Sequence, residues 1–381
     1  MVSRAERSAF GDWWWTIDRF LLAALAALMV IGLVFLMAGG PPVAERLGLS
    51  TFHFVNRQVL FLLPTVAILV GVSFLSLRHV RRLALIVYAA GMGLVFLAFH
   101  FGPEIKGAHR WIMLGGIGIQ PSEFVKPAFV VITAWAFSEN ARRKDMPGAL
   151  LAFLILPATI IPLILQPDFG QTMLVTAVWC GLFFVAGLHW FWVMGLGGLG
   201  LAGIVAAYEF LPHVRARIER FMDKDSGDSF QVDMALDSFA RGGWLGRGPG
   251  EGTVKRILPD AHTDFIFAVT AEEFGIVVCI ALVVLFALVV LRGLMLARRS
   301  EDTFCRLAVT GLMMMFGLQA AINMTVNVHL IPAKGMTLPF ISYGGSSMLS
   351  LALGMGFLIA LTRRRPRAEM MDPLNSGWGR G

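Results

Sequence analysis

The amino-acid sequence predicts an all-α, polytopic membrane protein with about ten transmembrane helices. Of its 381 residues, 57% are hydrophobic and only 15% are charged, and the mean hydropathy is +0.72, so the apolar residues exceed what one soluble core needs. Apolar runs of roughly 20 residues, the length that crosses a ~30 Å hydrocarbon core, recur from Phe20 almost to the C-terminus. These runs are too uniformly apolar for the alternating strands of a membrane barrel, which leaves helices.

The apolar runs define a single membrane domain over residues 20–365, between an N-terminal segment 1–19 and a polar C-terminal tail 366–381. The first run is not followed by a small-residue cleavage site, so we expect it to remain as the first helix. The expected spans are 20–38, 59–77, 83–101, 122–138, 148–165, 171–188, 191–211, 265–291, 304–327 and 342–361.

Basic residues orient these spans. Clusters follow the second, fourth, eighth and tenth spans, at 78–82, 142–144, 292–299 and 363–367. The positive-inside rule places that side, and with it both termini, in the cytoplasm. The formal charge of +7 therefore reflects membrane orientation, and we expect no nucleic-acid partner. Cys180, Cys279 and Cys305 lack metal-ligand or disulfide-framework spacing and are interpreted as packing residues.

Three connections on the opposite face are candidates for chemistry: 102–121, 166–170 and a long loop at about 213–263. The long loop carries eight basic and eight acidic residues, which argues against a polybasic lipid tether. Its glycine-rich segment 243–252 permits tight turns and close approach of the backbone to a ligand. A flexible loop tip explains the same composition, and the segment lacks the Lys-Ser/Thr pair of a nucleotide-binding P-loop.

Asp264 is the first catalytic candidate, because it lies where the chain enters the eighth expected span. Partial desolvation there would raise the pKa of a carboxylate toward a value useful for proton abstraction. The alternative is that Asp264 caps the following helix. Asp260, His262 and Asp264 together could also coordinate a divalent cation, since carboxylate and imidazole groups are suitable ligands.

Other charged residues lie inside or beside the spans and need partners there. Glu123 and Lys126 are three residues apart, which favours a structural ion pair over direct substrate contact. Asp168 is open to the same two interpretations, and Glu272 and Glu273 lie inside the eighth expected span. Arg110 and Trp111 suit a phosphate and a sugar ring, or else ordinary interfacial anchoring. The hydroxyl-rich segment 342–347, which includes Ser346, is interpreted as a helix-packing surface.

Five segments, 107–112, 119–126, 166–170, 258–267 and 335–347, resemble in order the signature blocks of the SEDS family of cell-wall glycosyltransferases (FtsW, RodA and SpoVE). The resemblance extends from the first helix to about Arg365. The last block, Gly335-Met-Thr-Leu-Pro-Phe-Ile-Ser-Tyr343 and the residues after it, resembles the FtsW branch more than the RodA branch.

The resemblance implies a peptidoglycan glycosyltransferase of the bacterial inner membrane that polymerises lipid II at the periplasmic face of the division septum. Implied partners are a class B penicillin-binding protein (an FtsI-like transpeptidase), other divisome proteins and membrane lipids. Asp264 matches the essential acidic residue and would act as general base. The resemblance establishes no cofactor, but a divalent cation, Mg²⁺ or Mn²⁺, or a loop cation such as Arg110 would stabilise the pyrophosphate. The implied substrate-binding residues are Arg110, Trp111, Lys126, Asp168, His262 and Ser346.

Two positions depart from the family pattern. Residue 118 is Gly where related chains often carry Arg, and segment 230–239 differs from the commoner Tyr-Gln and Gln-Ser pattern, which puts the acceptor side of the loop in doubt. Two other functions stay open at this point. A lipid II flippase would show repeat symmetry or interrupted helices near the midplane, and neither is evident in the sequence. A non-catalytic division scaffold would tolerate Asp264→Asn.

Overall fold

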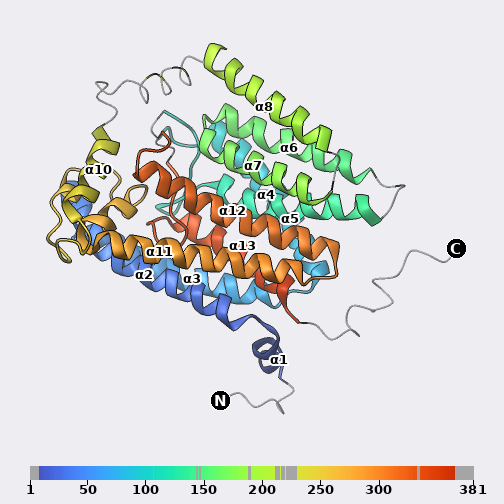
Figure 1. Ribbon diagram of the computed structural model, residues 1–381, viewed down its shortest axis with the longest axis horizontal. Coiled ribbons are helices and arrows are strands. Elements are labelled where there is room, and N and C mark those ends of the chain that lie inside the picture. The colour runs from blue at the N-terminus through green and yellow to red at the C-terminus, as the bar shows by residue number, and fades with distance from the viewer. Residues whose placement is uncertain are drawn as a thin grey trace.

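The computed structural model describes residues 8–105, 107–142, 145, 147–187, 190–210, 215, 219, 230–332 and 335–364. The predicted domain boundary near 365, the C-terminal tail and most of 211–229 lie outside the described residues. The described part is almost entirely helical, with one short hairpin, which confirms the predicted fold class (Figure 1).

The helices in chain order are α1 (Ala9–Thr16), α2 (Arg19–Arg46), α3 (His53–Ser73), α4 (Leu77–Phe101), α5 (Pro121–Arg142), α6 (Gly148–Leu165), α7 (Phe169–Val185), α8 (Trp190–Phe210), α10 (Phe230–Gly242), α11 (Ile266–Arg298), α12 (Thr303–Asn327) and α13 (Gly345–Thr362). A 3-10 turn, η2, covers Val254–Arg256, and strands β1 (Ile112–Leu114) and β2 (Ile117–Ile119) pair antiparallel.

Each of the ten expected spans coincides with one helix, from α2 to α8 and from α11 to α13. Among the described residues, seven helices are long and apolar enough to cross a membrane: α2, α3, α4, α6, α11, α12 and α13. The 17 residues of α7 are shorter than that standard. Helix α5 carries charges in its first and last turns, and it is instead buried along most of its length.

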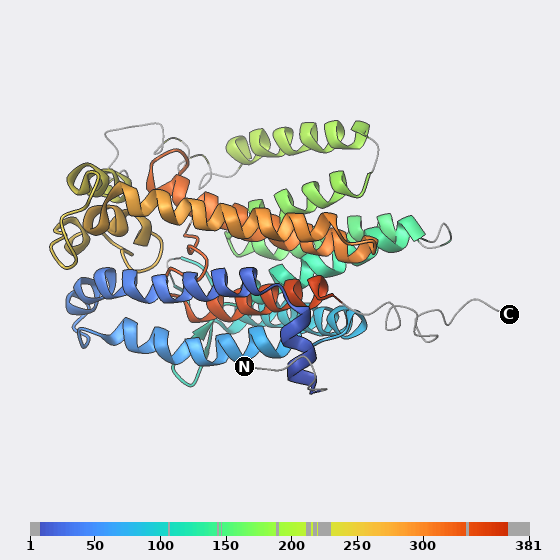
Figure 2. The same cartoon turned by 60° about the horizontal axis from the view of Figure 1, so that its bottom comes forward.

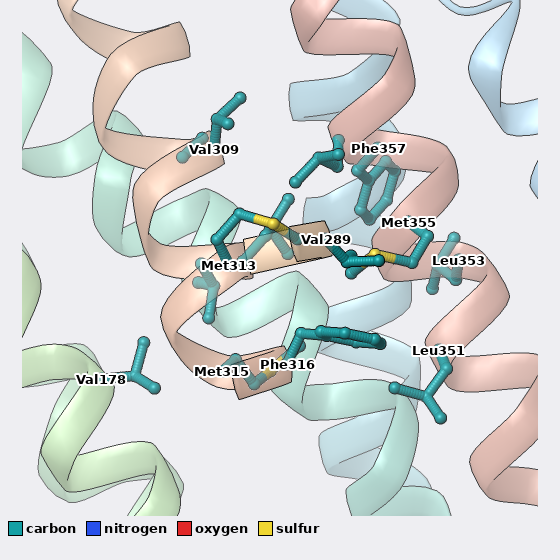
Figure 3. Close-up of a cluster of buried hydrophobic side chains, with 14 of the residues drawn as sticks. Val178, Val289, Val309, Met313, Met315, Phe316, Leu351, Leu353, Met355 and Phe357 are labelled. Atoms are coloured by element: carbon teal, nitrogen blue, oxygen red, sulfur yellow. The ribbon is translucent and has the colours of Figure 1, made fainter. Parts of the chain in front are cut away.

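The core lies where α5, α12 and α13 pack together in the middle of the bundle. Val289 of α11, Met313 and Phe316 of α12, and Met355 and Phe357 of α13 are all buried and interleave there (Figure 3). Helices α2, α3, α4, α6, α7 and α11 surround this centre, whereas α8 lies at one edge beside α7 (Figure 1). An apolar core enclosed by apolar outer helices is the expected arrangement for a lipid-embedded bundle.

The two ends of the bundle differ in character. At one end, Arg292 of α11 pairs with Asp18 at the start of α2 (2.6 Å), and Arg142 of α5 pairs with Asp302 before α12 (2.9 Å). Arg142, Arg292 and, through the bond of Arg363 to Thr16 (3.1 Å), helix α1 therefore lie at this end. The hairpin, α10 and the connection after α12 lie at the other end, which is called the outer end below (Figure 2). The arrangement supports the predicted even number of crossings.

The hairpin was not predicted. Strand β1 pairs with β2 in the register Ile112 to Ile119, and the turn between them is made by Gly115 and Gly116, both with positive φ (56° and 80°). Two consecutive positive φ angles are what a type I′ hairpin turn requires. The hairpin folds the connection between α4 and α5 over the outer end of the bundle.

Helix α11 is interrupted at Gly275 (φ 84°, ψ 171°), so the expected continuous eighth span is wrong in this detail. The broken helical hydrogen bonds are replaced by bonds to the glycine-rich loop. Ile276 N donates to Gly243 O (3.0 Å), and Arg247 N donates to Glu272 O (2.9 Å). The loop therefore packs into the break, and the loop-tip interpretation of the glycine-rich segment is corrected.

Candidate active site

Asp264 lies at the outer end of α11, half-buried, immediately before the helix. The N-cap position of α11 belongs to Phe265, whose side chain has no hydrogen-bonding group. The amide N–H of Ala268 is instead capped by the side chain of Asn327 (3.0 Å). Asp264 therefore does not occupy the helix-capping position that was the alternative to a catalytic role.

Two amide side chains of α12 hold the backbone of Asp264. Nδ2 of Asn323 and Nδ2 of Asn327 each donate to the carbonyl oxygen of Asp264 at 2.9 Å. Asn323 also donates to Met336 O (2.6 Å). The carboxylate faces the same segment, since a Cβ placed on Gly335 would lie 3.6 Å from Oδ2 of Asp264. The backbone that carries this carboxylate is thus held in place.

The turn that precedes Asp264 is pinned from the opposite side. Ser342 Oγ donates to Thr263 O (2.6 Å), and Tyr343 N donates to His262 O (2.9 Å). The imidazole of His262 is buried in a cluster with the rings of Phe54 (4.2 Å between centroids) and Tyr343 (5.5 Å). His262 therefore contributes packing that shapes the turn.

The candidate cation ligands are not gathered into a cluster. Asp260 has a left-handed backbone (φ 52°), and its carbonyl accepts from Thr263 N (3.0 Å), so the turn is tight. Within the described ranges, no group of three or more His, Cys, Asp or Glu side chains is placed to hold a metal ion.

Lys126 and Glu123 form an ion pair in the first turns of α5. Nζ of Lys126 lies 3.0 Å from both carboxylate oxygens, and both side chains are buried. Gln171 donates to Glu123 (2.7 Å), and Lys126 donates to Gln319 (3.4 Å). Removing either charge would leave the other buried and uncompensated.

Asp168 and Arg110 meet at the short turn between α6 and α7. Nη1 of Arg110 lies 4.0 Å from Oδ1 of Asp168, and other guanidinium nitrogens donate to Gln166 O (2.7 Å) and Pro167 O (2.6 Å). Burial raises the pKa of the Asp168 carboxyl, and the charge of Arg110 opposes that rise only in part. Gln120 donates to the other oxygen of Asp168 (3.2 Å).

Trp111 and Ser346 fix the hairpin above α13. The ring of Trp111 lies against Gly118, where a Cβ would come within 3.3 Å of it. Ser346 Oγ accepts from Gln120 N (3.1 Å) and donates to Gly118 O (3.2 Å). The Gly at 118 thus makes room for the tryptophan that precedes β1, which gives a packing reason for the departure noted at this position.

Glu272 and Glu273 anchor the glycine-rich loop. The carboxylate of Glu272 accepts from Thr253 N (2.6 Å), Val254 N (2.9 Å) and Lys255 N (3.3 Å) at the start of η2. Glu273 pairs with Lys255 and accepts from Gly250 N (3.1 Å). Both glutamates are buried. Their partners are therefore the backbone and the cation of the loop itself.

Sequence reasoning missed a row of amides on α12. Gln319, Asn323 and Asn327 are spaced four residues apart, so they share one face of the helix. Gln319 donates to Thr337 O (3.1 Å) and accepts from Lys126, while the two asparagines hold Asp264. The row links the buried ion pair of α5 to the outer carboxylate. Polar residues repeated at this spacing in an apolar helix were the available signal.

The chemistry that this arrangement permits is proton abstraction at the outer face. The carboxylate of Asp264 is half-buried, and the backbone carbonyl of the same residue is held by Asn323 and Asn327. The carboxylate lies beside the segment that begins at Gly335. Behind it lies a buried polar network that reaches Lys126, Glu123 and, through Gln171, Asp168. Such preorganisation is typical of sites that bind a polar substrate and act on it.

The chain was compared with known proteins. The family model of FtsW, RodA and SpoVE, described as "Cell cycle protein", matches residues 18–366. A protein named "Probable peptidoglycan glycosyltransferase FtsW" from Caulobacter vibrioides is 44% identical over 367 residues, which are 96% of this chain and 94% of that protein.

Two solved structures are similar over nearly the whole chain. A chain of a peptidoglycan synthase complex, described as coordinating polymerization and crosslinking, has a TM-score of 0.78 and 29% identity, over 93% of this chain and 99% of that one. The rod shape determining protein RodA of Thermus thermophilus has a TM-score of 0.67 and 28% identity, over 92% and 97%. The chain belongs to the FtsW/RodA/SpoVE family.

Proposed function

We propose that this chain is a peptidoglycan glycosyltransferase that polymerises lipid II at the outer face of the inner membrane during septal wall synthesis. The family membership and the name of the Caulobacter relative support the reaction class. The observation that carries the proposal at the level of residues is Asp264, whose backbone is clamped by Asn323 and Asn327. A general base needs a well-placed backbone, and this clamp holds the backbone of Asp264.

In the proposed reaction, the Asp264 carboxylate takes the proton from the acceptor sugar hydroxyl. The hydroxyl oxygen attacks the anomeric carbon of the donor, the bond from that carbon to the pyrophosphate oxygen breaks, and undecaprenyl pyrophosphate leaves with the electron pair. A half-buried carboxylate suits this step because it is still accessible to the acceptor hydroxyl whose proton it takes.

The growing charge on the pyrophosphate needs a cation. The guanidinium of Arg110 already donates to the carbonyls of Gln166 and Pro167 and pairs with Asp168, so we assign Arg110 mainly to positioning that turn. A divalent cation would need oxygens from the pyrophosphate, because the described part of the chain offers no three-ligand cluster.

A flippase is the main alternative, and the break in α11 at Gly275 is the kind of interruption found in transporters. The break is filled, however, by hydrogen bonds from the loop at 243–248. It also lies in the outer third of a 33-residue helix rather than at its middle. The interruption therefore provides the backbone groups that bind the loop at 243–248, and the polymerase is the better-supported function.

The proposed setting follows from the relatives. The structure similar to this chain belongs to a complex described as joining polymerization with crosslinking. We propose that this chain likewise works with a class B, FtsI-like penicillin-binding protein and other divisome proteins, at the septum.

The reaction is tested by incubating the purified chain and its cognate class B penicillin-binding protein with labelled lipid II in detergent. Detergent micelles have no second side, so a flippase yields no product, whereas a polymerase yields glycan strands that separate by length on a gel. Unchanged lipid II from a complex shown to be folded, with Mg²⁺ or Mn²⁺ supplied, would reject the proposal.

A further inference from the structure

The turn at residues 243–246 is the part of the described outer loop that reaches furthest along α11. Helix α10 descends beside α11, with the ring of Phe239 5.7 Å from that of Phe267. The carbonyls of Gly243 and Trp244 then accept from Ile276 N (3.0 Å) and Val277 N (3.2 Å).

After this turn the chain returns outward. Arg247 N donates to Glu272 O (2.9 Å) and Gly248 N to Glu273 O (3.0 Å), each about a turn of α11 nearer its outer end. A Cβ on Gly275 would lie 2.3 Å from Trp244 O, so the turn is fitted closely into the break. Its place beside α11 is therefore fixed.

Two helices give the level of this turn in the membrane. Asp18 and Arg292 pair at the cytoplasmic end (2.6 Å), and roughly 20 helical residues span the ~30 Å hydrocarbon core. Counting that length from Asp18 along α2 reaches Ala38, whose carbonyl accepts from Lys255 of the loop (3.3 Å). Counting back from Arg292 along α11 reaches about residue 272. The turn beside 276–277 thus lies about one helical turn inside the outer hydrocarbon boundary.

The side chains at this level are apolar and exposed. Trp244 is 69% exposed and Leu245 is 82% exposed. They lie next to the exposed apolar face of α11, which begins at Val277 and continues through Ile280, so the apolar surface of the turn extends the lipid-facing surface of the helix. Exposed Arg241 and Arg247 flank the pair in sequence. Trp and Leu beside Arg is the composition of a membrane-interface anchor.

We propose that Trp244 and Leu245 insert into the outer leaflet and anchor the outer loop to phospholipid. The ligand is the interface between acyl chains and headgroup phosphates of the surrounding bilayer. The anchor sets the height of the loop, which continues through Lys255 to the turn that bears Asp264. This inference is independent of the proposed reaction, because it concerns only where the loop lies.

The test places an NBD fluorophore on the full-length chain at Leu245→Cys, with Cys180→Ala to remove the exposed native thiol; Cys279 and Cys305 are buried. Asp233→Cys is the matched control, because Asp233 is an exposed residue on α10 about 15 Å further outward. Both proteins are reconstituted in vesicles of phosphatidylethanolamine and phosphatidylglycerol. Quenching by 5-doxyl lipid and by aqueous iodide is measured.

The expected result is quenching by doxyl lipid about threefold or more stronger at 245 than at 233, with iodide quenching in the opposite order. Equal access of iodide to both positions would overturn the proposal, because the turn would then lie in water. A label at 245 that is shielded from both quenchers would also overturn it, since protein rather than lipid would cover the turn.

Discussion

Replacing Asn323 by Leu tests whether the amide row positions Asp264. The substitution keeps the approximate size of the side chain but removes the hydrogen bonds to Met336 O (2.6 Å) and Asp264 O (2.9 Å). Met336 O then lacks its donor, whereas Asp264 O keeps Asn327 (2.9 Å). The first loss costs about 1–3 kcal/mol of unfolding free energy.

A second effect of Asn323→Leu offsets part of this loss of stability. Oδ1 of Asn323 is buried without a hydrogen-bond partner among the described residues, and its removal relieves a penalty of similar size, about 1–3 kcal/mol. The net change in unfolding free energy is therefore within about 2 kcal/mol in either direction, which leaves most molecules folded. Asp264, by contrast, loses half of the clamp on its carbonyl. A displacement near 1 Å lowers a reaction rate by about 100-fold.

The assay measures glycan-strand formation per folded molecule across pH, with the folded fraction taken from thermal melting. Leu312→Ala is the control, because Leu312 is a fully buried residue of the same helix about 16 Å away, and its truncation costs about 2–5 kcal/mol. We expect Asn323→Leu to lose about 100-fold in kcat with a changed pH profile, and Leu312→Ala to keep both. Equal activity of the two variants per folded molecule would refute the positioning role.

Three further changes follow from the same contacts. Gly275→Ala should lower the unfolding free energy by about 3 kcal/mol or more, because φ is +84° and the backbone of Trp244 fills the space beside Gly275. Gly203→Ala is the control, because the space around Gly203 is open. Equal melting temperatures of the two variants would contradict this prediction. Glu272→Ala leaves buried loop amides unpaired and should lower the unfolding free energy by about 3–5 kcal/mol. Proteolysis of the outer loop should then be faster, and an unchanged cleavage rate would show that Glu272 does not hold the loop. Burial raises the pKa of Asp168 in the folded state. This lowers the stability of the wild type as pH rises above about 4, the pKa of the unfolded chain, and Asp168→Asn should abolish that decline. Parallel plots of melting temperature against pH for the two proteins would exclude the effect.

The helices were predictable because their signal is local. An apolar run of the right length predicts a span wherever it falls, and the expected run 148–165 coincides with α6. The hairpin was also within reach, since Gly115 and Gly116 stand between two short apolar segments, which is a recognised hairpin pattern. The remaining features depend on contacts between distant parts of the chain.

The break at Gly275 shows why distant contacts escaped prediction. A single glycine inside an apolar run is tolerated by a continuous helix, and only the turn at 243–246, some thirty residues earlier, makes the break favourable. In the same way, Glu272 and Glu273 look like isolated charges within a span until residues 250–255 fold onto them.

The candidate site divides along the same line. Asp264 and the pair Glu123 and Lys126 were found from residue type and spacing. The asparagines that hold Asp264 come from a different helix, and their partner is a backbone carbonyl, which carries no signal in a sequence. Their spacing on α12 was an available signal of a shared polar face that the sequence analysis missed, and only the fold identifies what that face contacts.

The most direct test of the account is the rate at which Asp264→Asn polymerises labelled lipid II, measured in the complex with the cognate class B penicillin-binding protein. Asp260→Asn is the matched control, because Asn accepts the left-handed backbone at that position (φ 52°) and loses the same charge from the same turn. If Asp264 is the general base, Asp264→Asn forms no glycan strands while its melting temperature and complex formation match the wild type, and Asp260→Asn stays active. Strand formation by folded Asp264→Asn at the wild-type rate would contradict the account.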